Sequence, residues 1–345
     1  MRLLKMMLFS ILILSLVACG GADESSTSEG SSDSGSEEEK IVIRAANYKN
    51  EKEITSLALD KFAEEVERLS EGRVEIDPYH NAELGDEADS IERILAGSIE
   101  MGEVGSSGLS QFGMNATPIN ELPYLFDDFA DFREILNNEE VRGLLSENLE
   151  NNGMKLLAFR YHGASHIMST SPLESIEDYK GRDFRAPEFD ITIELLKSWG
   201  GSPNVIPYTE VYNALQTGVV EGYTATLTAT LSERTYEVAN NLNMTNHMYT
   251  PSYLVMNKDY FESFSSDVQE ILLEAAKISE DYQIGLAEDQ EEKDLQQLEA
   301  EGVNIVKYDD LTPFKEAIAD KRQGLAEAMG PEAVELYETI LKINE

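Results

Sequence analysis

The side chain with the clearest binding chemistry in this sequence is Arg185, which follows a short apolar segment. A guanidinium group is a rigid fork of N–H donors that matches a carboxylate through two parallel hydrogen bonds, and it keeps its charge at ordinary pH. At a strand end from which water can be excluded, such a group predicts binding of a carboxylate. The alternative is a local ion pair with Glu188 or Asp190, of the kind that carries no function.

The elements expected around Arg185 form an α/β unit. Residues 183–186 are predicted to be a strand, followed by a helix, a Gly-Gly turn, a short strand, a helix that begins at Thr209 and a further strand. Tyr208 lies just before that second helix, where an aromatic ring can pack on the carbon skeleton of a ligand. An ordinary core tyrosine is the alternative. Tyr223 lies at the next strand end, where ligands of open α/β sheets bind.

A β-α-β-α-β order is expected over residues 41–104, with the second strand stopped at Pro78. This order predicts a parallel sheet with helices on its faces. Polar residues at strand ends or at a helix start in this half are further candidate ligand contacts. They are Asn47, Tyr48, Glu87 and Ser106. Each of them could equally be a helix cap or a surface residue.

Longer elements are expected later in the chain. Residues 156–160, 163–168 and 253–256 are predicted to be separate strands. Ser266 is predicted to cap a long helix, with Gln269 as its capping-box partner and an end near residue 298. A helix of this length can span two lobes, or it can lie on the surface of a single domain. The fold class predicted is α/β.

The composition excludes several classes of function. With 345 residues, 27 basic and 66 acidic side chains and a formal charge of −39, the chain is long enough for two domains but has no basic patch for nucleic acid or anionic lipid. It has no G-x-S-x-G, P-loop or dinucleotide glycine pattern, and its only cysteine is Cys19. His162 and His166 lack the glutamate of an H-E-x-x-H zinc motif. A binding protein without a cofactor is therefore predicted, rather than an enzyme.

The N-terminus has the features of a lipoprotein signal peptide. Arg2 and Lys5 precede an apolar segment at 8–18, and residues 16–19 read L-V-A-C, which resembles a bacterial lipobox. We therefore expect residues 1–18 to be removed and Cys19 to be lipidated on the outer face of the cell membrane. Residues 19–39 would then be a disordered acidic tether rich in serine and glycine. A plain signal peptide or a short anchor helix is the alternative.

Six motifs in order resemble the solute-binding proteins of TRAP (tripartite ATP-independent periplasmic) transporters. They are E-L-G-D-E at 83–87, L-P-Y-L-F at 122–126, D-Y-K-G-R-D-F-R-A-P at 178–187, P-Y-T-E-V-Y-N-A-L-Q-T-G-V-V-E-G at 207–222, M-T-N-H at 244–247 and Y-L-V-M-N-K at 253–258. The resemblance implies a periplasmic-binding-protein-like fold of two lobes, each a sheet flanked by helices, with the long helix spanning both. It also implies that Arg185 is the ligand arginine.

The same resemblance implies a function. The lobes would close by a hinge motion on a small organic acid and deliver it to membrane permease subunits driven by an ion gradient, and the receptor would be a monomer. We expect the first lobe at 40–163 and about 251–290, and the second at 164–250 and about 291–345. A sensory lipoprotein that docks on a signalling receptor would need the same cleft, so it stays as the alternative.

Three positions depart from the pattern of the sialate-type receptors. Ser171 stands where these receptors have a second arginine, Ala225 where they have an asparagine, and Ser165 where they have an additional arginine. Ser171 remains a candidate ligand contact. With one strong cation, the pocket would favour a small or more apolar monocarboxylate over a dianion. A metal ion that assists binding of the carboxylate also stays open.

Overall fold

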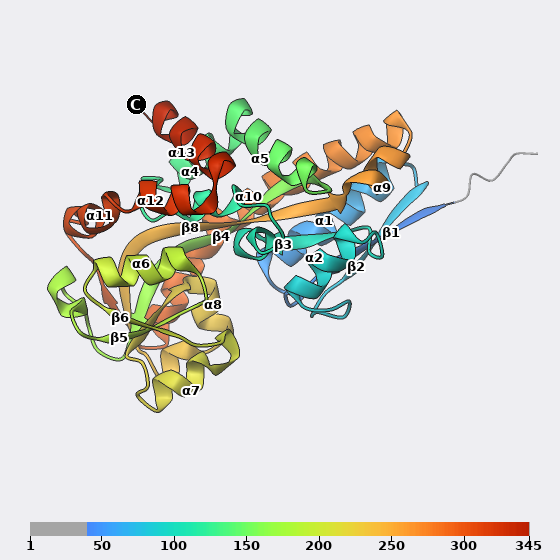
Figure 1. Cartoon of the computed structure of the whole chain (residues 1–345). Coiled ribbons are helices and arrows are strands. Elements are labelled where there is room, and N and C mark those ends of the chain that lie inside the picture. Colours follow the sequence, from blue (N-terminus) through green and yellow to red (C-terminus); the bar gives the residue numbers. More distant parts are fainter. Residues whose placement is uncertain (1–39, 345) are drawn as a thin grey trace, which may run out of the picture. The chain divides into compact units, whose positions relative to one another are not determined.

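The computed structural model describes residues 40–344, which form the α/β fold expected from the sequence. The predicted signal peptide, Cys19 and the tether fall within residues 1–39 and lie outside the described residues. In the described part of the chain, nine strands form one mixed sheet in the order β2-β1-β3-β8-β4-β7-β5-β6, with β9 beside β8 (Figure 1).

The elements have the following bounds. The strands are β1 (Ile41–Asn47), β2 (Val74–Tyr79), β3 (Met101–Gly105), β4 (Met154–Ser169), β5 (Asp183–Ala186), β6 (Ser202–Val205), β7 (Gly222–Thr226), β8 (Asn241–Asn257) and β9 (Asn304–Val306). The α-helices are α1 (Ile54–Leu69), α2 (Glu87–Leu95), α3 (Ser106–Ser110), α4 (Phe129–Asn137), α5 (Glu139–Asn151), α6 (Asp190–Ser198), α7 (Val211–Gln216), α8 (Leu227–Ser232), α9 (Lys258–Ser263), α10 (Ser266–Ala300), α11 (Thr312–Ala319), α12 (Arg322–Met329) and α13 (Pro331–Ile343). The 3₁₀ turns are η1 (Thr117–Glu121), η2 (Ile176–Tyr179), η3 (Tyr208–Glu210) and η4 (Thr235–Glu237).

Two long antiparallel strands, β4 and β8, run through both lobes of the fold. The second half of β8 pairs with β3, and its first half pairs with β9. The two strands predicted at 156–160 and 163–168 are in fact one strand, β4. Its pairing with β8 passes from Tyr161 opposite Pro251 to Ala164 opposite Tyr249, so β4 carries one extra residue. A β-bulge of this kind bends a strand without ending it, and Gly163, with φ of 105°, supplies the backbone freedom.

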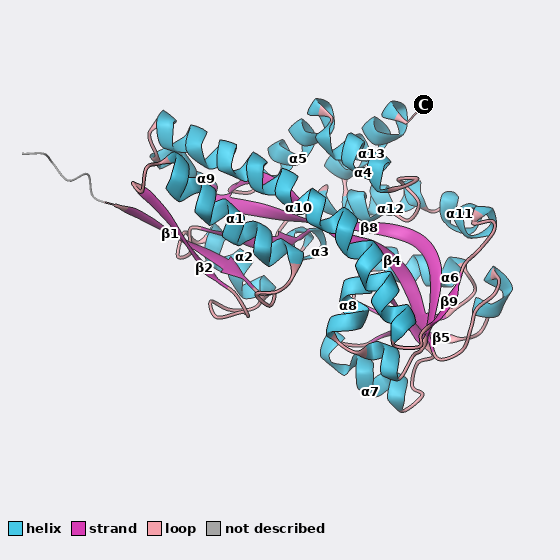
Figure 2. Cartoon of the chain, turned by 180° about the vertical axis from the view of Figure 1, so that it is seen from behind, coloured by secondary structure: helices cyan, strands magenta, loops and turns pink. Residues whose placement is uncertain are grey.

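The predicted long helix is confirmed as α10, which has 35 residues. At 1.5 Å per residue this is about 52 Å. It packs on α1 at one end, on β4 in the middle and on α8 at the other, and it lies along the back of the sheet (Figure 2). Within residues 40–344, no helix is both long and apolar enough to cross a membrane.

Two local predictions are wrong. Ser265 is the N-cap of α10, and Gln269 donates instead to the carbonyl oxygens of Phe261 and Phe264, so there is no capping box. Strand β2 does not stop at Pro78 but continues to Tyr79. Because β2 lies at the edge of the sheet, the N–H group that proline lacks is not needed for pairing on its free side.

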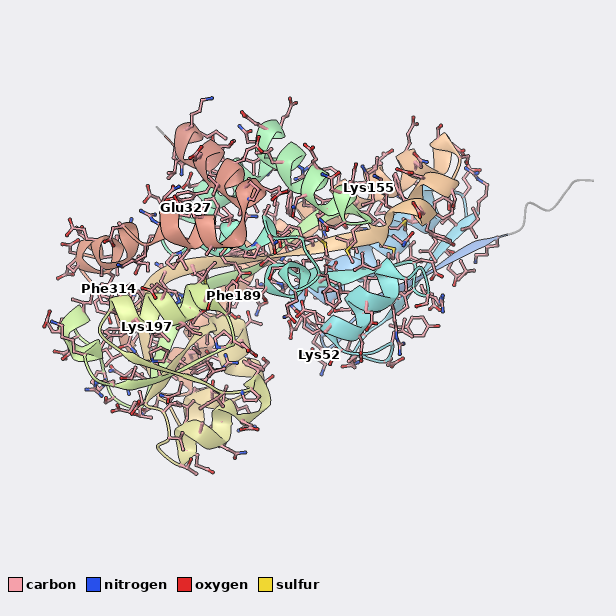
Figure 3. All side chains as sticks on the ribbon, in the orientation of Figure 1. Lys52, Lys155, Phe189, Lys197, Phe314 and Glu327 are labelled. Atoms are coloured by element: carbon pink, nitrogen blue, oxygen red, sulfur yellow. The ribbon has the colours of Figure 1, made fainter. Side chains whose placement is uncertain are left out.

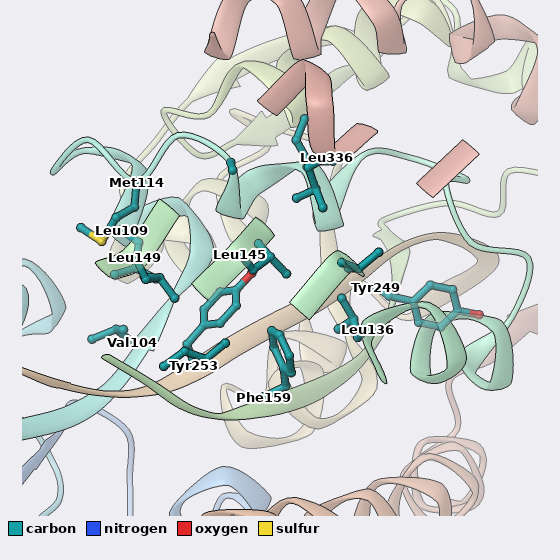
Figure 4. Close-up of a cluster of buried hydrophobic side chains, with 14 of the residues drawn as sticks. Val104, Leu109, Met114, Leu136, Leu145, Leu149, Phe159, Tyr249, Tyr253 and Leu336 are labelled. Atoms are coloured by element: carbon teal, nitrogen blue, oxygen red, sulfur yellow. The ribbon is translucent and has the colours of Figure 1, made fainter. Parts of the chain in front are cut away.

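The largest apolar cluster joins segments from distant parts of the chain. Leu145 and Leu149 of α5, Val104 of β3 and Tyr253 of β8 lie together in it (Figure 4), and Leu336 of α13 belongs to the same cluster. Helix α13 thus packs on α5 and η1, which belong to the segment expected in the first lobe. The lobe boundaries stay a prediction. Helix α13, which that prediction places in the second lobe, makes these contacts with segments that it places in the first lobe.

A buried ion pair ties β4 to β3 and α10. Arg160 is fully buried, and its Nε donates to Glu103 Oε1 at 3.0 Å while Nη2 donates to Ser279 Oγ at 3.1 Å. The other oxygen of Glu103 has no partner among the described residues. The arginine is therefore the main group that compensates the buried carboxylate charge.

Replacing Arg160 should destabilise the fold strongly. We expect R160A to lower the free energy of unfolding by about 3–5 kcal/mol, because it leaves Glu103 buried without a partner. Urea denaturation followed by circular dichroism would measure this. K293A, which breaks an exposed pair with Asp289, is the control and should change the free energy by less than about 1 kcal/mol. Equal effects of the two variants would contradict the assigned role of Arg160.

Candidate ligand-binding site

A cleft of two joined cavities lies between the helix α3 region and the β5–β7 region. The first cavity has a volume of about 760 Å³, and the second has about 540 Å³. Both are lined by Tyr208, Thr226 and Ala229, so we treat them as one cleft. Concave sites of this size hold small organic ligands with most of their surface buried.

The wall of the first cavity is rich in hydroxyl groups. From the α3 side it includes Ser107, Ser110, Gln111 and Glu121. From the opposite side it includes Thr224 and Thr226 of β7, Thr192 of α6 and Phe189, which lies on the segment that leads into α6 (Figure 3). Hydroxyl groups both donate and accept hydrogen bonds, so this lining suits a polar ligand with several oxygen atoms.

Arg185 lies on β5, behind Tyr208. Its side chain is only 7% exposed, its Nε donates to the carbonyl oxygen of Ile206 at 2.8 Å, and its Cζ lies 5.6 Å from the ring centroid of Tyr208. Burial lowers the pKa of Arg185, and the nearby Tyr208 and Tyr223 partly oppose this effect. Within residues 40–344 the side chains whose charge acts on Arg185 are these two tyrosines, and no carboxylate is among them. The alternative of a local pair with Glu188 or Asp190 is therefore not what the fold contains.

The two tyrosines predicted beside Arg185 lie in different surroundings. Tyr208 begins the 3₁₀ turn η3, is 45% exposed and lines both cavities. Tyr223 lies on β7 directly opposite Arg185 in the parallel pairing, but its side chain is fully buried and its hydroxyl shares a hydrogen bond with Thr235 Oγ1 at 2.5 Å. The fold brings Tyr208 to the cleft and places Tyr223 in the core beneath it.

Among the candidates of the first lobe, Tyr48 reaches the cleft. It lines the second cavity, and burial together with the nearby carboxylate of Glu87 raises its pKa well above the usual value. Asn47 is buried and bonds to Ser56 Oγ at 2.8 Å, to the ring of His80 at 2.9 Å and to the backbone N–H of Lys49. It thus holds the turn that carries Tyr48.

Glu87 and Ser106 lie just behind the cavity wall. Glu87 Oε1 accepts a hydrogen bond from the backbone N–H of Gly105 at 2.6 Å. A Cβ atom at Gly108 would lie 2.9 Å from Glu87 Cδ, so a larger residue there would displace the carboxyl group of Glu87 from this position. Ser106 is 1% exposed and donates to Glu121, which itself lines the cavity. Both residues therefore position the wall formed by α3 and η1.

The three departures from the sialate-type pattern differ in position. Ser165 and Ala225 line the first cavity, as expected for positions that would otherwise carry ligand-binding side chains. Ser171 does not line either cavity. Its hydroxyl accepts a hydrogen bond from Arg182 Nη1 at 2.7 Å, and Arg182 also pairs with Glu221.

Among the residues that the structure describes, five charged side chains that were not predicted as ligand contacts line the cleft: Lys49, Glu53, Glu121, Glu188 and Glu233. Lys49 lines the second cavity, with its Nζ 2.7 Å from Nδ1 of His162 and 3.9 Å from a carboxylate oxygen of Glu53, and burial lowers its pKa. Glu121 lines the first cavity. No sequence pattern marks Lys49 or Glu121 as a ligand contact. A lysine in a turn and a glutamate before L-P-Y-L-F are typical of surface residues.

Residues 40–344 contain no group of three or more histidine, cysteine, aspartate or glutamate side chains placed to hold a metal ion. The cleft lining offers the ring of Tyr208, a wall of hydroxyl groups and several charged side chains, and Arg185 lies behind Tyr208 without lining either cavity. This set of groups can bind an oxygen-rich anion.

Comparisons with known proteins agree with this chemistry. Residues 45–327 match the family described as "Bacterial extracellular solute-binding protein, family 7". A sialic acid-binding periplasmic protein of Vibrio cholerae is 30% identical over 258 residues, which are 74% of this chain and 79% of that protein. A C4-dicarboxylate-binding periplasmic protein of Rhodobacter capsulatus is 28% identical over 280 residues, 81% of each chain.

A solved structure shares the fold as well. The TRAP periplasmic solute-binding protein of Chromohalobacter salexigens, with bound D-glucuronate, matches with a TM-score of 0.80 and 28% identity, over 87% of this chain and 99% of that one. The family match covers most of the chain, and the relatives named here are receptors for solutes. The protein therefore belongs to family 7 of the bacterial extracellular solute-binding proteins, the family of the TRAP transporter receptors.

Proposed function

We propose that this protein captures a hydroxylated organic monocarboxylate in its cleft and delivers it to the membrane permease subunits of a TRAP transporter. The observation that carries the proposal is Arg185, a mostly buried cation beside Tyr208 with no carboxylate partner in the described part of the chain. Burying an unpaired charge is unfavourable. A ligand carboxylate would supply the missing partner and would gain strength from the exclusion of water.

The lining of the cleft favours a sugar acid over an apolar acid. Serine and threonine hydroxyls surround the first cavity, and each can bond to a ligand hydroxyl. Sialic acid and D-glucuronate, named for two of the relatives, are both hydroxylated monocarboxylates. A single buried arginine supports one carboxylate, whereas the dicarboxylate named for the third relative would need a second cation. Lys49 is the candidate for that role, but it already contacts His162 and lies near Glu53.

The receptor role needs no chemical change in the ligand. We propose that the lobes close over the acid by a bend in β4 and β8, and that the closed monomer is the form the permease recognises. The relatives named above are described as periplasmic binding proteins for acids, one of them as a TRAP solute-binding protein, which favours transport over the sensory alternative.

A screen of acids against the full-length protein tests the ligand class. We expect hexuronates, aldonates and sialate to raise the melting temperature more than C4-dicarboxylates or aromatic acids do. A ligand at 100 to 1,000 times its Kd should add about 2.7–4.1 kcal/mol. Each acid is measured with and without calcium. A response to dicarboxylates alone would contradict the monocarboxylate proposal, and no response to any acid would contradict the proposed function.

Removal of the arginine should abolish capture. We expect R185A to weaken binding of the best acid by at least about a hundredfold, since the ligand carboxylate would be left unpaired. R185K should show an intermediate loss, because an ammonium group lacks the bidentate fork. Isothermal titration calorimetry would measure both. R182A is the matched control, because Arg182 pairs with Glu221 and Ser171 outside the cleft, and it should bind normally. Micromolar binding by R185A would contradict the proposal.

We further propose that Cys19 carries a lipid that anchors the receptor to the outer face of the cell membrane, as the lipobox-like sequence at 16–19 suggests. Cells that express the wild-type chain should incorporate radiolabelled palmitate into the protein and retain it in the membrane fraction. C19A should lose the label and leave that fraction while its binding of the acid is unchanged. Membrane retention of unlabelled C19A would argue against a lipid anchor.

A further inference from the structure

Glu121 is a buried carboxyl group in the wall of the ligand cavity. It is the last residue of η1, it is 5% exposed, and it lines the first cavity beside Ser107, Ser110 and Gln111. Ser106 Oγ donates a hydrogen bond to its Oε1. A carboxyl group at the wall of a site for anions is unexpected, because an ionised carboxylate would repel the ligand.

Within residues 40–344, no cation is among the groups that act on the charge of Glu121. The nearby carboxyl group that contributes to raising its pKa is Glu87 of α2, which lies behind the same wall. From β8, Tyr253 faces it with a hydroxyl that is bonded to Asn120 and to the carbonyl oxygen of Thr117. Glu188 lines the opposite side of the cavity.

The other elements that pack near η1 contribute polar and apolar side chains to the surroundings of Glu121. Helix α3 presents serines and Gln111, and α13 contributes Leu336 and Ile340 to the apolar cluster that includes Ile119 and Leu122. Burial, with a smaller contribution from Glu87, raises the pKa of Glu121 to about 8. At neutral pH the side chain is therefore mostly the uncharged acid.

An uncharged carboxylic acid has one acceptor oxygen and one O–H donor. In Glu121 the acceptor is Oε1, which takes the hydrogen bond from Ser106. The O–H on the other oxygen is then free to donate into the cavity that the side chain lines. The opposite wall of that cavity includes Tyr208, which packs on Arg185.

We propose that Glu121 binds the ligand as a neutral acid, donating a hydrogen bond from its O–H to a hydroxyl or carbonyl oxygen on the part of the ligand away from the carboxylate. This inference rests on the proposed function, and it narrows the ligand class to hydroxy and keto acids. An acid without such an oxygen would leave the buried O–H unpaired, which disfavours its binding.

The proposal predicts that affinity depends on pH in a defined direction. The ligand carboxylate is ionised throughout the range from pH 6 to 9.5, so its own charge does not change. As Glu121 loses its proton above about pH 8, the donor is lost and a negative charge appears beside the anion. Affinity of the full-length protein should therefore fall roughly thirtyfold between pH 7 and 9.5, as tenfold per unit above the pKa requires.

The E121Q variant separates this effect from others. A glutamine amide can accept from Ser106 and donate to the ligand, but it cannot ionise. We expect E121Q to bind D-glucuronate, or the acid with the largest response in the screen above, within about threefold of wild type at pH 7 and with no comparable fall up to pH 9.5. E121A, which lacks the donor, should bind about tenfold more weakly at pH 7.

K49R is the matched control for the pH profile. Burial lowers the pKa of Lys49, so this side chain can also lose its charge as the pH rises, and that loss would weaken anion binding as well. Arginine stays charged, so K49R should keep the wild-type fall in affinity if Glu121 causes it. A flat K49R profile, or an unchanged fall in E121Q, would overturn the proposal and leave the receptor function in place. No binding of any acid by wild type or E121Q would overturn both.

A measurement without ligand reports the protonation of Glu121 directly. Because its pKa is about 8 in the folded protein and near 4.5 when unfolded, the folded state holds the proton that the unfolded state releases between these values. The melting temperature of wild type relative to E121Q should therefore fall as pH rises from 5 to 8 and level off above. A constant difference would show that Glu121 is ionised in the fold and would overturn the inference.

Discussion

The continuous pairing of β4 with β8 is the constraint on which the rest of the fold depends. Both strands pass through the two lobes, so each lobe builds its sheet on one half of the same pair. Where the register shifts near Tyr161, the strand needs partners that the sheet does not supply. Two buried side chains of α10 supply them. Glu280 accepts from the backbone N–H of Phe159 at 2.8 Å, and Gln283 bonds to both the N–H and the carbonyl oxygen of Tyr161.

These bonds fix the middle of α10 against the bulge of β4. If α10 ended earlier, the backbone groups near the bulge would be buried without partners, which costs stability. The bend in β4 is therefore held by side chains and not by the sheet ladder alone. Side-chain partners can adjust their geometry more readily than a continuous ladder, so a change of angle at this point is compatible with keeping the two halves of the sheet intact.

Part of this arrangement could be predicted from the sequence, because it depends on local pattern. The strand Asp183–Ala186 and the apolar face of α1, with Phe62 and Val66, follow from spacing alone. The single strand β4 could not be predicted, since its bulge exists only in register with β8. Alternation along a strand also does not say which face meets the ligand, and so Tyr223 was expected at the cleft but lies in the core. The pKa values of Lys49 and Glu121 are shifted by burial, and burial at these positions cannot be predicted from the local sequence pattern.

The charges of the site work against the charge of the whole chain. A formal charge of −39 repels an organic anion at long range, but at physiological ionic strength this repulsion is screened beyond about 8 Å. Inside the cleft screening is weak, so in the proposed function Arg185 and the uncharged Glu121 would hold the anion. Glu121 of η1 lines the cleft, and Arg185 of β5 lies behind Tyr208, which lines the opposite wall, although the two segments are more than sixty residues apart in the sequence. In the proposed function, a ligand that bonds to both walls would stabilise the closed arrangement over the open one by its differential contacts, and so one oxygen-rich acid would both occupy the site and close it.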